Sequence, residues 1–251
     1  MLFGLALLAG LVGYAVVDPF DSADAHNDTD SDAGLDVSGD PTDSLGSLLD
    51  DPDVAENEPE VIITGTEQDD LIYGGDGDYT VNGGDGDDQL HGGDGSDTLN
   101  GEAGDDRLYA GDGIIGQSIN TLNGGDGDDI LYGSNEAENI LNGDDGDDQI
   151  HIRGHDTATG GTGADSFIYS TEYGDGALGT ITDYVADDDQ IVVEYMTDET
   201  SSDEVPAPEV SIIVDGVDAM ICLDGNECMI VQGAANSLAL EDILLRASPV
   251  I

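Results

Sequence analysis

Aspartate carboxylates recur through the middle of the chain inside glycine-rich frames that are nine residues long. The clearest frame, GGDGDDQLH from Gly83, has Gly at positions 1, 2 and 4 and Asp at positions 3, 5 and 6. Glycine lets the backbone take positive φ and approach a ligand closely. Carboxylate and carbonyl oxygens, with no nitrogen or sulfur among the donors, select Ca²⁺ over zinc or iron. The pattern therefore predicts a row of calcium sites.

The elements that must position these carboxylates can be rebuilt from the same repeat. Frames begin at residues 65, 74, 83, 92, 101, 110, 124, 133, 143, 152 and 160, with an insertion after 110 and irregular frames at 133 and 152. Position 8 is apolar in the well-formed frames: Ile72, Val81, Leu90, Leu99, Leu108, Leu122, Leu131, Ile150 and Phe167. One inward residue between two outward ones makes a short strand that buries a single side chain. Stacking such strands would join the apolar residues into one thin core.

This repeat resembles the nonapeptide G-G-x-G-x-D-x-U-x of the repeats-in-toxin (RTX) family of haemolysin-type calcium-binding proteins. The resemblance covers about 100 residues, and the segment 181–191 is similar to the one that usually follows the last repeat in that family. It implies an all-β fold, a right-handed parallel β-roll (a β-solenoid) with two repeats per coil. Frames n and n+2 would then stack on the same edge of the roll.

The two edges of such a roll differ in their acidic residues. The first edge holds the frames from 65, 83, 101, 124, 143 and 160, and it has Asp at position 6 throughout: Asp70, Asp88, Asp106, Asp129, Asp148 and Asp165. The second edge has only Asp97 there, with Tyr79 and Ile115 in two other frames. We therefore expect roughly four or five Ca²⁺ ions on the first edge, none to two on the second, and roughly four to seven in total.

The resemblance also implies which groups hold each ion, namely position-6 carboxylates and backbone carbonyls from two stacked loops. The position-3 acids are second-choice ligands or line the edge: Asp76, Asp85, Asp94, Asp126 and Asp145. The glycines expected to line the loops are Gly83, Gly84, Gly86, Gly124, Gly125, Gly127, Gly143, Gly160, Gly161 and Gly163. Position-5 acids such as Asp87 and Asp128 should face solvent. Because empty carboxylates repel one another, binding and folding are expected to be one event.

The overall charge excludes several classes of function. Asp and Glu number 58 against three Arg and no Lys, which gives a formal net charge of −55. A nucleic-acid binder needs a basic face to displace counterions from phosphates, and an anionic membrane surface attracts basic segments. Both partners are therefore excluded, and cations are favoured.

The chain divides into four parts on composition. Residues 1–17 are hydrophobic, which predicts an export signal or an N-terminal membrane anchor, with a hydrophobic helix packed on the domain as the alternative. Residues 18–60 carry 15 acids and few large apolar groups, which predicts a disordered acidic tether. The β-roll is expected over 61–169, and a small antiparallel β domain over 170–251 should cap its C-terminal end.

Cys222 and Cys228 flank an Asp224-Gly225 turn signal in this last part. A three-residue loop over 224–226 would pair Cys222 directly with Cys228, which allows a cross-strand disulfide if the protein is exported. Two buried thiols are the alternative.

Histidine and tyrosine residues are the remaining candidates for catalysis and ligand binding. His151 and His155 have neither a His-Glu-x-x-His motif nor a third ligand, so a zinc site is not expected. Tyr73, Tyr109, Tyr132 and Tyr169 follow the repeat, which indicates surface residues beside the strands, with a ligand-binding stripe as the lesser alternative.

The sequence thus predicts a non-enzymatic calcium-binding protein, secreted or held at the cell surface, that folds on meeting calcium outside the cell. The family resemblance implies type I export. One alternative is an adhesin or surface-layer component that binds a cell-surface or matrix ligand. Another is a non-catalytic relative of a secreted RTX enzyme.

Overall fold

A computed structural model describes residues 14–15, 61–111, 118–134, 137–171, 178–197 and 207–249. The predictions for the rest of the N-terminal segment and for the tether over 18–60 concern residues outside the described ones. The described residues from 61 onward belong to one compact unit. In the part of the chain that is described, no helix has the length and apolar character needed to cross a membrane.

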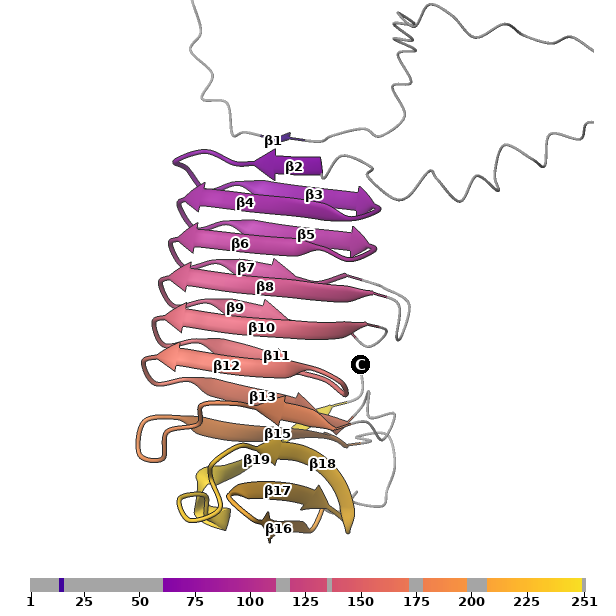
Figure 1. Ribbon diagram of the computed structural model, residues 1–251, viewed down its shortest axis with the longest axis vertical. Helices are drawn as coiled ribbons and strands as arrows, with labels where there is room; N and C mark the ends of the chain where they lie inside the picture. Colours follow the sequence, from indigo (N-terminus) through magenta and orange to yellow (C-terminus); the bar gives the residue numbers. More distant parts are fainter. Residues whose placement is uncertain are drawn as a thin grey trace, which may run out of the picture. The chain divides into compact units, whose positions relative to one another are not determined.

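Two β-sheets stack face to face, and the chain alternates between them, as Figure 1 shows. The nine-stranded sheet has the order β1 (Tyr14–Ala15), β3 (Leu71–Asp76), β5 (Gln89–Asp94), β7 (Arg107–Tyr109), β9 (Ile130–Tyr132), β11 (Gln149–Ile152), β13 (Ser166–Ser170), β15 (Gln190–Thr197) and β19 (Ile243–Pro249). The ten-stranded sheet has the order β16 (Val210–Asp215), β17 (Asp218–Leu223), β18 (Asn226–Val231), β14 (Gly179–Ile181), β12 (Thr157–Thr162), β10 (Glu138–Asp145), β8 (Ile119–Asp126), β6 (Thr98–Ala103), β4 (Tyr79–Asp85) and β2 (Val61–Thr64).

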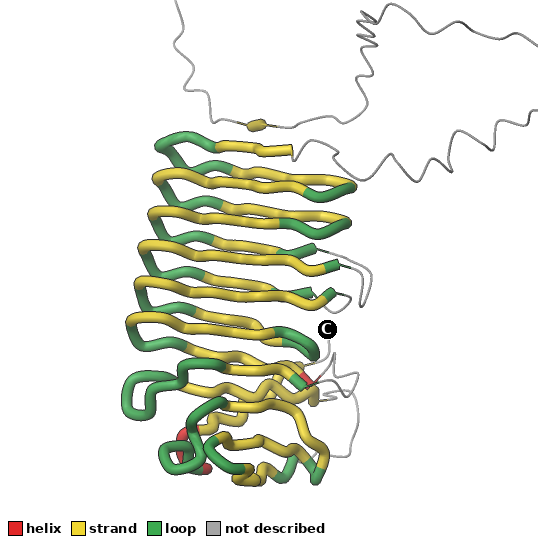
Figure 2. The backbone as a smooth tube through the Cα atoms, viewed as in Figure 1, coloured by secondary structure: helices red, strands yellow, loops and turns green. Residues whose placement is uncertain are grey.

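Neighbouring strands are parallel through the whole repeat region, and the register is that of two frames per coil. Leu90 pairs with Leu108 and Leu108 with Leu131 in one sheet, while Leu99 pairs with Leu122 in the other. The predicted all-β parallel β-roll is confirmed. Turns between the sheets form a regular column at the first edge, visible as loops in Figure 2.

The core is a single layer of side chains between the two sheets. Each predicted position-8 residue is buried, from Ile72 at 1% exposure to Val81, Leu90, Leu122 and Phe167 at 0%. Burying a side chain of this size contributes about 1.5–3 kcal/mol, so no single coil is stable and the stack supplies the stability. Asparagines on the outer side of the ten-stranded sheet reinforce it, since Asn100, Asn123 and Asn142 each donate from Nδ2 to the preceding asparagine Oδ1 at 2.7 Å.

The C-terminal part differs in detail from the expected separate cap. The parallel sheets continue past residue 169, because β14 and β15 add to them and β18 and β19 then pair in parallel with β14 and β15. Only β16, β17 and β18 pair antiparallel to one another. The last helical element is the short 3-10 helix η2 (Leu240–Asp242).

Two predictions about side chains in this region are wrong. Tyr169 is a core residue with 4% exposure, because it lies two residues after Phe167 on the inward side of β13. Asp224 and Gly225 both have positive φ and form a two-residue turn, so Cys222 pairs with Glu227 and a bulge displaces Cys228. The direct pairing of Cys222 with Cys228 is therefore wrong, and both cysteines are buried as thiols.

Candidate metal centre

The position-6 aspartates of the first edge form one continuous ladder. In each coil the Oδ1 atom accepts a hydrogen bond from the backbone N–H of the position-6 residue one coil earlier. The donor–acceptor distances are 2.7 Å for Asp70 to Asp88, 2.7 Å for Asp88 to Asp106 and 2.7 Å for Asp106 to Asp129. They are 2.8 Å for Asp129 to Asp148 and 3.0 Å for Asp148 to Asp165. The structure thus brings the six predicted first-edge carboxylates into one file.

The second carboxylate oxygen has a different status. Oδ2 of Asp88, Asp106, Asp129 and Asp148 is buried without a hydrogen-bond partner, and Asp97 on the second edge repeats this. Leaving a buried acceptor without a hydrogen-bond partner costs about 1–3 kcal/mol, and more when the group is charged. A recurring orphan oxygen at one position is therefore best explained by a cation that is part of the functional molecule.

The position-1 glycines frame these orphan oxygens. A Cβ added to Gly124 would collide with Oδ2 of Asp129 and with the carbonyl oxygen of Gly143 in the next coil. A Cβ added to Gly83, Gly101 or Gly143 would collide with the equivalent pair of oxygens in its own coil and the next one. Only glycine leaves space there, so a carboxylate oxygen and a carbonyl oxygen from two stacked loops face the same small volume. This is a donor set of hard oxygens, which suits Ca²⁺.

Burial raises the pKa of every ladder aspartate in the interior of the edge. The pKa is raised to about 6 for Asp88, about 7 for Asp106, about 8 for Asp129, about 7 for Asp148 and about 6 for Asp165. Repulsion from neighbouring aspartates adds to the loss of solvation, while the ladder hydrogen bonds oppose it. These carboxylates therefore ionise at neutral pH at a cost that a bound cation would offset.

At the two ends of the ladder, hydrogen bonds from the protein satisfy the carboxylate oxygens. Oδ2 of Asp70 accepts from the backbone N and the Oγ1 of Thr66 at 2.7 and 2.8 Å. At the other end Asp189 accepts from Asp165 N at 3.1 Å and from Val185 N at 2.7 Å. Asp183 accepts from the backbone N of Gly160 and of Gly161, each at 2.9 Å. Asp183 and Asp189 were not predicted as site residues, although they lie in the post-repeat segment that the family resemblance singled out.

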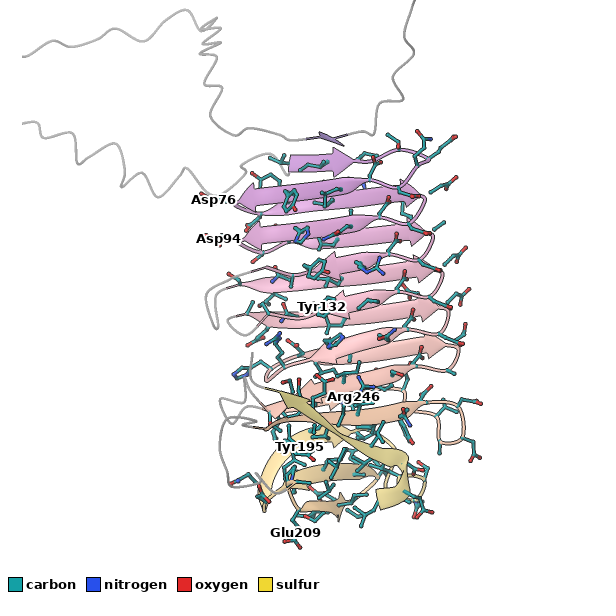
Figure 3. All side chains as sticks on the ribbon, turned by 180° about the vertical axis from the view of Figure 1, so that it is seen from behind. Asp76, Asp94, Tyr132, Tyr195, Glu209 and Arg246 are labelled. Carbon is teal, nitrogen blue, oxygen red and sulfur yellow. The ribbon has the colours of Figure 1, made fainter. Side chains whose placement is uncertain are left out.

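The other predicted acids lie outside this row. The position-5 aspartates form an exposed outer ladder, for example Asp147 N to Asp128 Oδ1 at 2.9 Å. The position-3 acids Asp76, Asp85, Asp94, Asp126 and Asp145 are exposed as well. Asp76 and Asp94 lie one above the other on the second edge, as Figure 3 shows and their strand pairing confirms.

The predicted loop glycines fall into two groups. Gly84, Gly86, Gly125, Gly127, Gly161 and Gly163 have φ between +109° and +140°, whereas Gly83, Gly124, Gly143 and Gly160 are the position-1 glycines beside Oδ2. At position 2 of two frames Glu102 and Asp144 replace glycine and have φ of 78° and 76°. Residues other than glycine rarely adopt this left-handed backbone conformation, so these two loops carry local strain.

The second edge has a different composition from the one predicted. Its ladder positions are Tyr79, Asp97, Asn120, Asn139 and Asp156, in that order along the coils. The predicted alignment placed Ile115 at the third position and had no aspartate in the last frame. Counting back from the apolar position 8 of each strand, rather than forward from glycine, would have found Asn120 and Asp156.

Among the described residues, no three Asp, Glu, His or Cys side chains converge as a metal cluster. A β-roll loop does not require one, because backbone carbonyls supply part of the coordination of a hard cation. Asp88, Asp106, Asp129 and Asp148, with the position-1 glycine carbonyls, fit Ca²⁺ on the evidence of the orphan oxygens.

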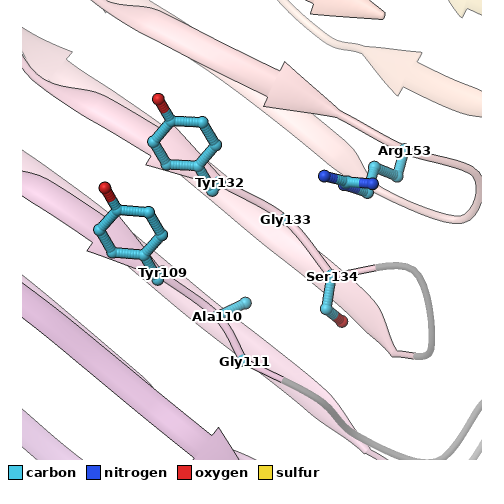
Figure 4. A pocket seen from close by; sticks show the side chains of 7 residues that line it. All are labelled: Tyr109, Ala110, Gly111, Tyr132, Gly133, Ser134 and Arg153. Carbon is cyan, nitrogen blue, oxygen red and sulfur yellow. The ribbon is translucent and has the colours of Figure 1, made fainter. Parts of the chain in front are cut away.

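A second arrangement lies on the outer side of the nine-stranded sheet. Tyr73, His91, Tyr109, Tyr132 and His151 stack in a column, with ring centroids 4.3–4.8 Å apart and interplanar angles of 3–18°. A cavity of about 320 Å³ beside it is lined by Tyr109, Tyr132, Ser134 and Arg153 among others, as seen in Figure 4. Burial lowers the pKa of His151 to about 4, so this ring is neutral at physiological pH.

Comparison with known proteins gives one family. The family described as RTX calcium-binding nonapeptide repeat matches in four copies, over residues 62–90, 82–114 and 153–168. No curated protein matches the chain. Among solved structures, the AlgE6R3 subunit of the mannuronan C5-epimerase from Azotobacter vinelandii is 20% identical, with 74% of this chain and 85% of that chain covered. Its TM-score is 0.20, which gives this likeness no weight for the fold or the function. Residues 62–114 and 153–168 thus match RTX calcium-binding nonapeptide repeats, and the described strands within these ranges belong to the β-roll.

Proposed function

We propose that this protein is secreted or displayed at the cell surface and that it folds when it binds several calcium ions outside the cell. The single observation that carries this proposal is the row of buried Oδ2 atoms without partners at Asp88, Asp106, Asp129 and Asp148. Four such atoms on the first edge and one at Asp97 support about four or five ions on the first edge and one on the second.

Folding outside the cell follows from the calcium concentrations on the two sides of a membrane. Extracellular calcium modules have dissociation constants of about 10⁻⁴–10⁻³ M. The calcium concentration in the cytosol is too low to fill sites of this affinity. The chain would then remain unfolded until export, and type I secretion is the route that the repeats suggest. We propose a structural role without catalysis, because the described ladder carboxylates are committed to N–H groups of neighbouring coils.

The test is a calcium titration of the chelated protein by calorimetry, with far-UV circular dichroism on the same samples. We expect about five to six ions per chain and a β signal that grows with calcium. A β signal that is unchanged by chelation and calcium would reject the proposal.

A second candidate function is adhesion, and the outer side of the nine-stranded sheet supports it. All three arginines of the chain lie in this sheet or directly after one of its strands: Arg107 in β7, Arg153 after β11 and Arg246 in β19. Arg246 is 53% exposed and pairs with Glu194 at 3.2 Å. Guanidinium groups beside a column of tyrosine and histidine rings suit a carboxylate- or sulfate-bearing surface polysaccharide.

Binding of the calcium-loaded protein to acidic and neutral polysaccharides would test this second function. Arg107→Gln and Tyr132→Ala should each weaken binding to the acidic polymer, and Thr98→Ala on the opposite sheet serves as the control. Equal binding by all three variants would mean that the polysaccharide does not bind to the outer side of the nine-stranded sheet.

A further inference from the structure

Two asparagines of the second edge occupy positions that aspartates occupy on the first edge. Asn120 and Asn139 precede the strand residues Thr121 and Ile140, as Asp106 precedes Arg107 on the first edge. Both are buried, with exposures of 0% and 1%. A buried amide is unusual unless its donors and acceptors are satisfied, so its partners are informative.

The amide nitrogen of Asn139 is surrounded by the kinds of oxygen that a calcium ion prefers. Its Nδ2 atom donates to the carbonyl oxygen of Ser134 at 3.2 Å, to the carbonyl oxygen of Ala137 at 3.4 Å and to Oδ1 of Asp156 at 2.6 Å. Two of these oxygens belong to the same loop as Asn139, and the third is a carboxylate of the next coil. First-edge loops offer an equivalent mixture of loop carbonyl and stacked carboxylate oxygens.

Asn120 makes a weaker version of the same arrangement one coil earlier. Its Oδ1 accepts from Asp97 N at 2.8 Å, which continues the ladder, and its Nδ2 donates to Oδ1 of Asn139 at 3.1 Å. The two amides thus link four coils of the second edge, from Asp97 to Asp156.

We propose that the side-chain amides of Asn120 and Asn139 take the place of calcium ions on the second edge, so that the coils from β8 to β12 close this edge without metal. The inference rests on the proposed calcium binding at the first edge. It assigns these two residues as the positions that decide which loops of this roll require an ion.

The carboxylate at the end of the chain of amides supports the assignment. Asp156 is 1% exposed, and both of its carboxylate oxygens have hydrogen-bond partners. Oδ1 accepts from Asn139 Nδ2, and Oδ2 accepts from Arg153 N at 2.8 Å. By contrast, Asp129 and Asp148 each keep an orphan Oδ2. An amide supplies two N–H donors without a net charge, so it satisfies oxygens but adds no electrostatic demand for a cation.

One consequence is an uneven response to calcium removal. The first-edge loops lose the cation that neutralises their ladder, whereas the second-edge loops between Asn120 and Asp156 keep every bond described above. We expect hydrogen exchange in chelator to be slower at the second-edge amide of Asn139 than at the first-edge amides of Asp106 and Asp129.

The decisive variant is Asn139→Asp, which restores the carboxylate found at first-edge position 6. It removes the donors and places a second carboxylate beside Asp156, so it should add one calcium ion per chain and make folding more dependent on calcium. The matched control is Asn123→Asp, the same change in the asparagine file on the sheet surface, where Nδ2 bonds Asn100 at 2.7 Å. The control should leave the ion count unchanged.

The reverse change tests the idea on the other edge even if Asn139→Asp fails to fold. Asp129→Asn should lose one ion but be more stable in chelator than Asp129→Ala, because the amide can replace the cation. Both variants are compared by ion count and by thermal unfolding of the full chain. Equal stability of the two in chelator would overturn the proposal.

The outcomes separate this inference from the proposed function. If the wild-type chain binds no calcium, the proposed function fails. If the wild-type chain binds calcium and Asn139→Asp binds the same number of ions, only the amide replacement is wrong.

Discussion

The two carboxylate oxygens of each position-6 aspartate have different roles. Oδ1 of Asp129 accepts the backbone N–H of Asp106 at 2.7 Å and so sets the spacing of the coils. Oδ2 is buried and has no partner in the described structure. The neighbouring Asp128 is exposed and accepts only from Asp147 N at 2.9 Å.

This contrast predicts different effects of removing adjacent carboxylates. Asp129→Ala should bind about one ion fewer and raise the calcium concentration needed for folding, because it deletes a ligand and a ladder bond together. Asp128→Ala should keep the ion count. Calorimetric ion counting on both variants checks this, and equal losses would show that the outer ladder also holds metal.

Backbone strain at Glu102 gives a second prediction about a single residue. Glu102 has φ of 78°, in a position where Gly84 and Gly125 have φ near 120°. Glu102→Gly should raise the stability of the calcium-loaded protein by about 1 kcal/mol, since an L-residue in this region costs about 1–2 kcal/mol. Thermal unfolding measures it, and Glu138→Gly in β10, where extended backbone favours a side chain, should destabilise instead.

At the scale of the elements, burial raises the pKa of the first-edge aspartates along the whole interior of the edge. Its five interior aspartates have pKa values raised from 3.8 to between about 6 and about 8, first by burial and then by their neighbours. A raised pKa in the folded state means that the fold binds protons more tightly than the unfolded chain. The stabilisation is complete below about pH 4 and is lost as the pH rises through 6 to 8.

Acid should therefore partly replace calcium. In calcium-depleted buffer, we expect the thermal midpoint to be highest near pH 4 and to fall toward pH 8. Asp129→Asn combined with Asp148→Asn should flatten this fall, because two of the titrating groups are gone. Circular dichroism melts at several pH values provide the measurement. A midpoint that rises with pH in depleted buffer would contradict the raised pKa values.

The elements also show which parts of the architecture the sequence could predict. The spacing of position-8 residues such as Leu90 and Leu108 predicts the register of the coils, because each nine-residue frame has room for one inward side chain. The first-edge carboxylates follow from the same count. Insertions hide the second edge, since Asn120 stands ten residues after Ala110 and the frame cannot be followed from its glycine.

The C-terminal region was less predictable for a different physical reason. Its strands have no repeat, so nothing in the spacing indicates that β18 and β19 extend the two parallel sheets. The sequence indicates a turn at Asp224-Gly225, but the length of the turn decides which residue faces Cys222. A shift of one residue moved Glu227 into the place expected for Cys228.

For the whole molecule, the net charge of −55 opposes compaction until cations bind. Two mechanisms could relieve it, namely general screening by salt and specific filling of the first-edge loops. At 1 M ionic strength the screening length is about 3 Å, so exposed acids no longer repel over the width of a loop. Buried atoms such as Oδ2 of Asp129 are screened much less, and they still lack a partner.

Salt, magnesium and calcium should therefore act differently on the chelated chain. Small-angle scattering should show contraction by sodium chloride without the β signal of the roll, because screening does not supply a ligand for the orphan oxygens. Magnesium should fold it poorly, since it demands octahedral geometry at about 2.0–2.1 Å and releases water reluctantly. Calcium at millimolar concentration should give both compaction and β structure. Full folding in sodium chloride alone would mean that charge repulsion, and not the ladder of partnerless carboxylate oxygens, keeps the roll open.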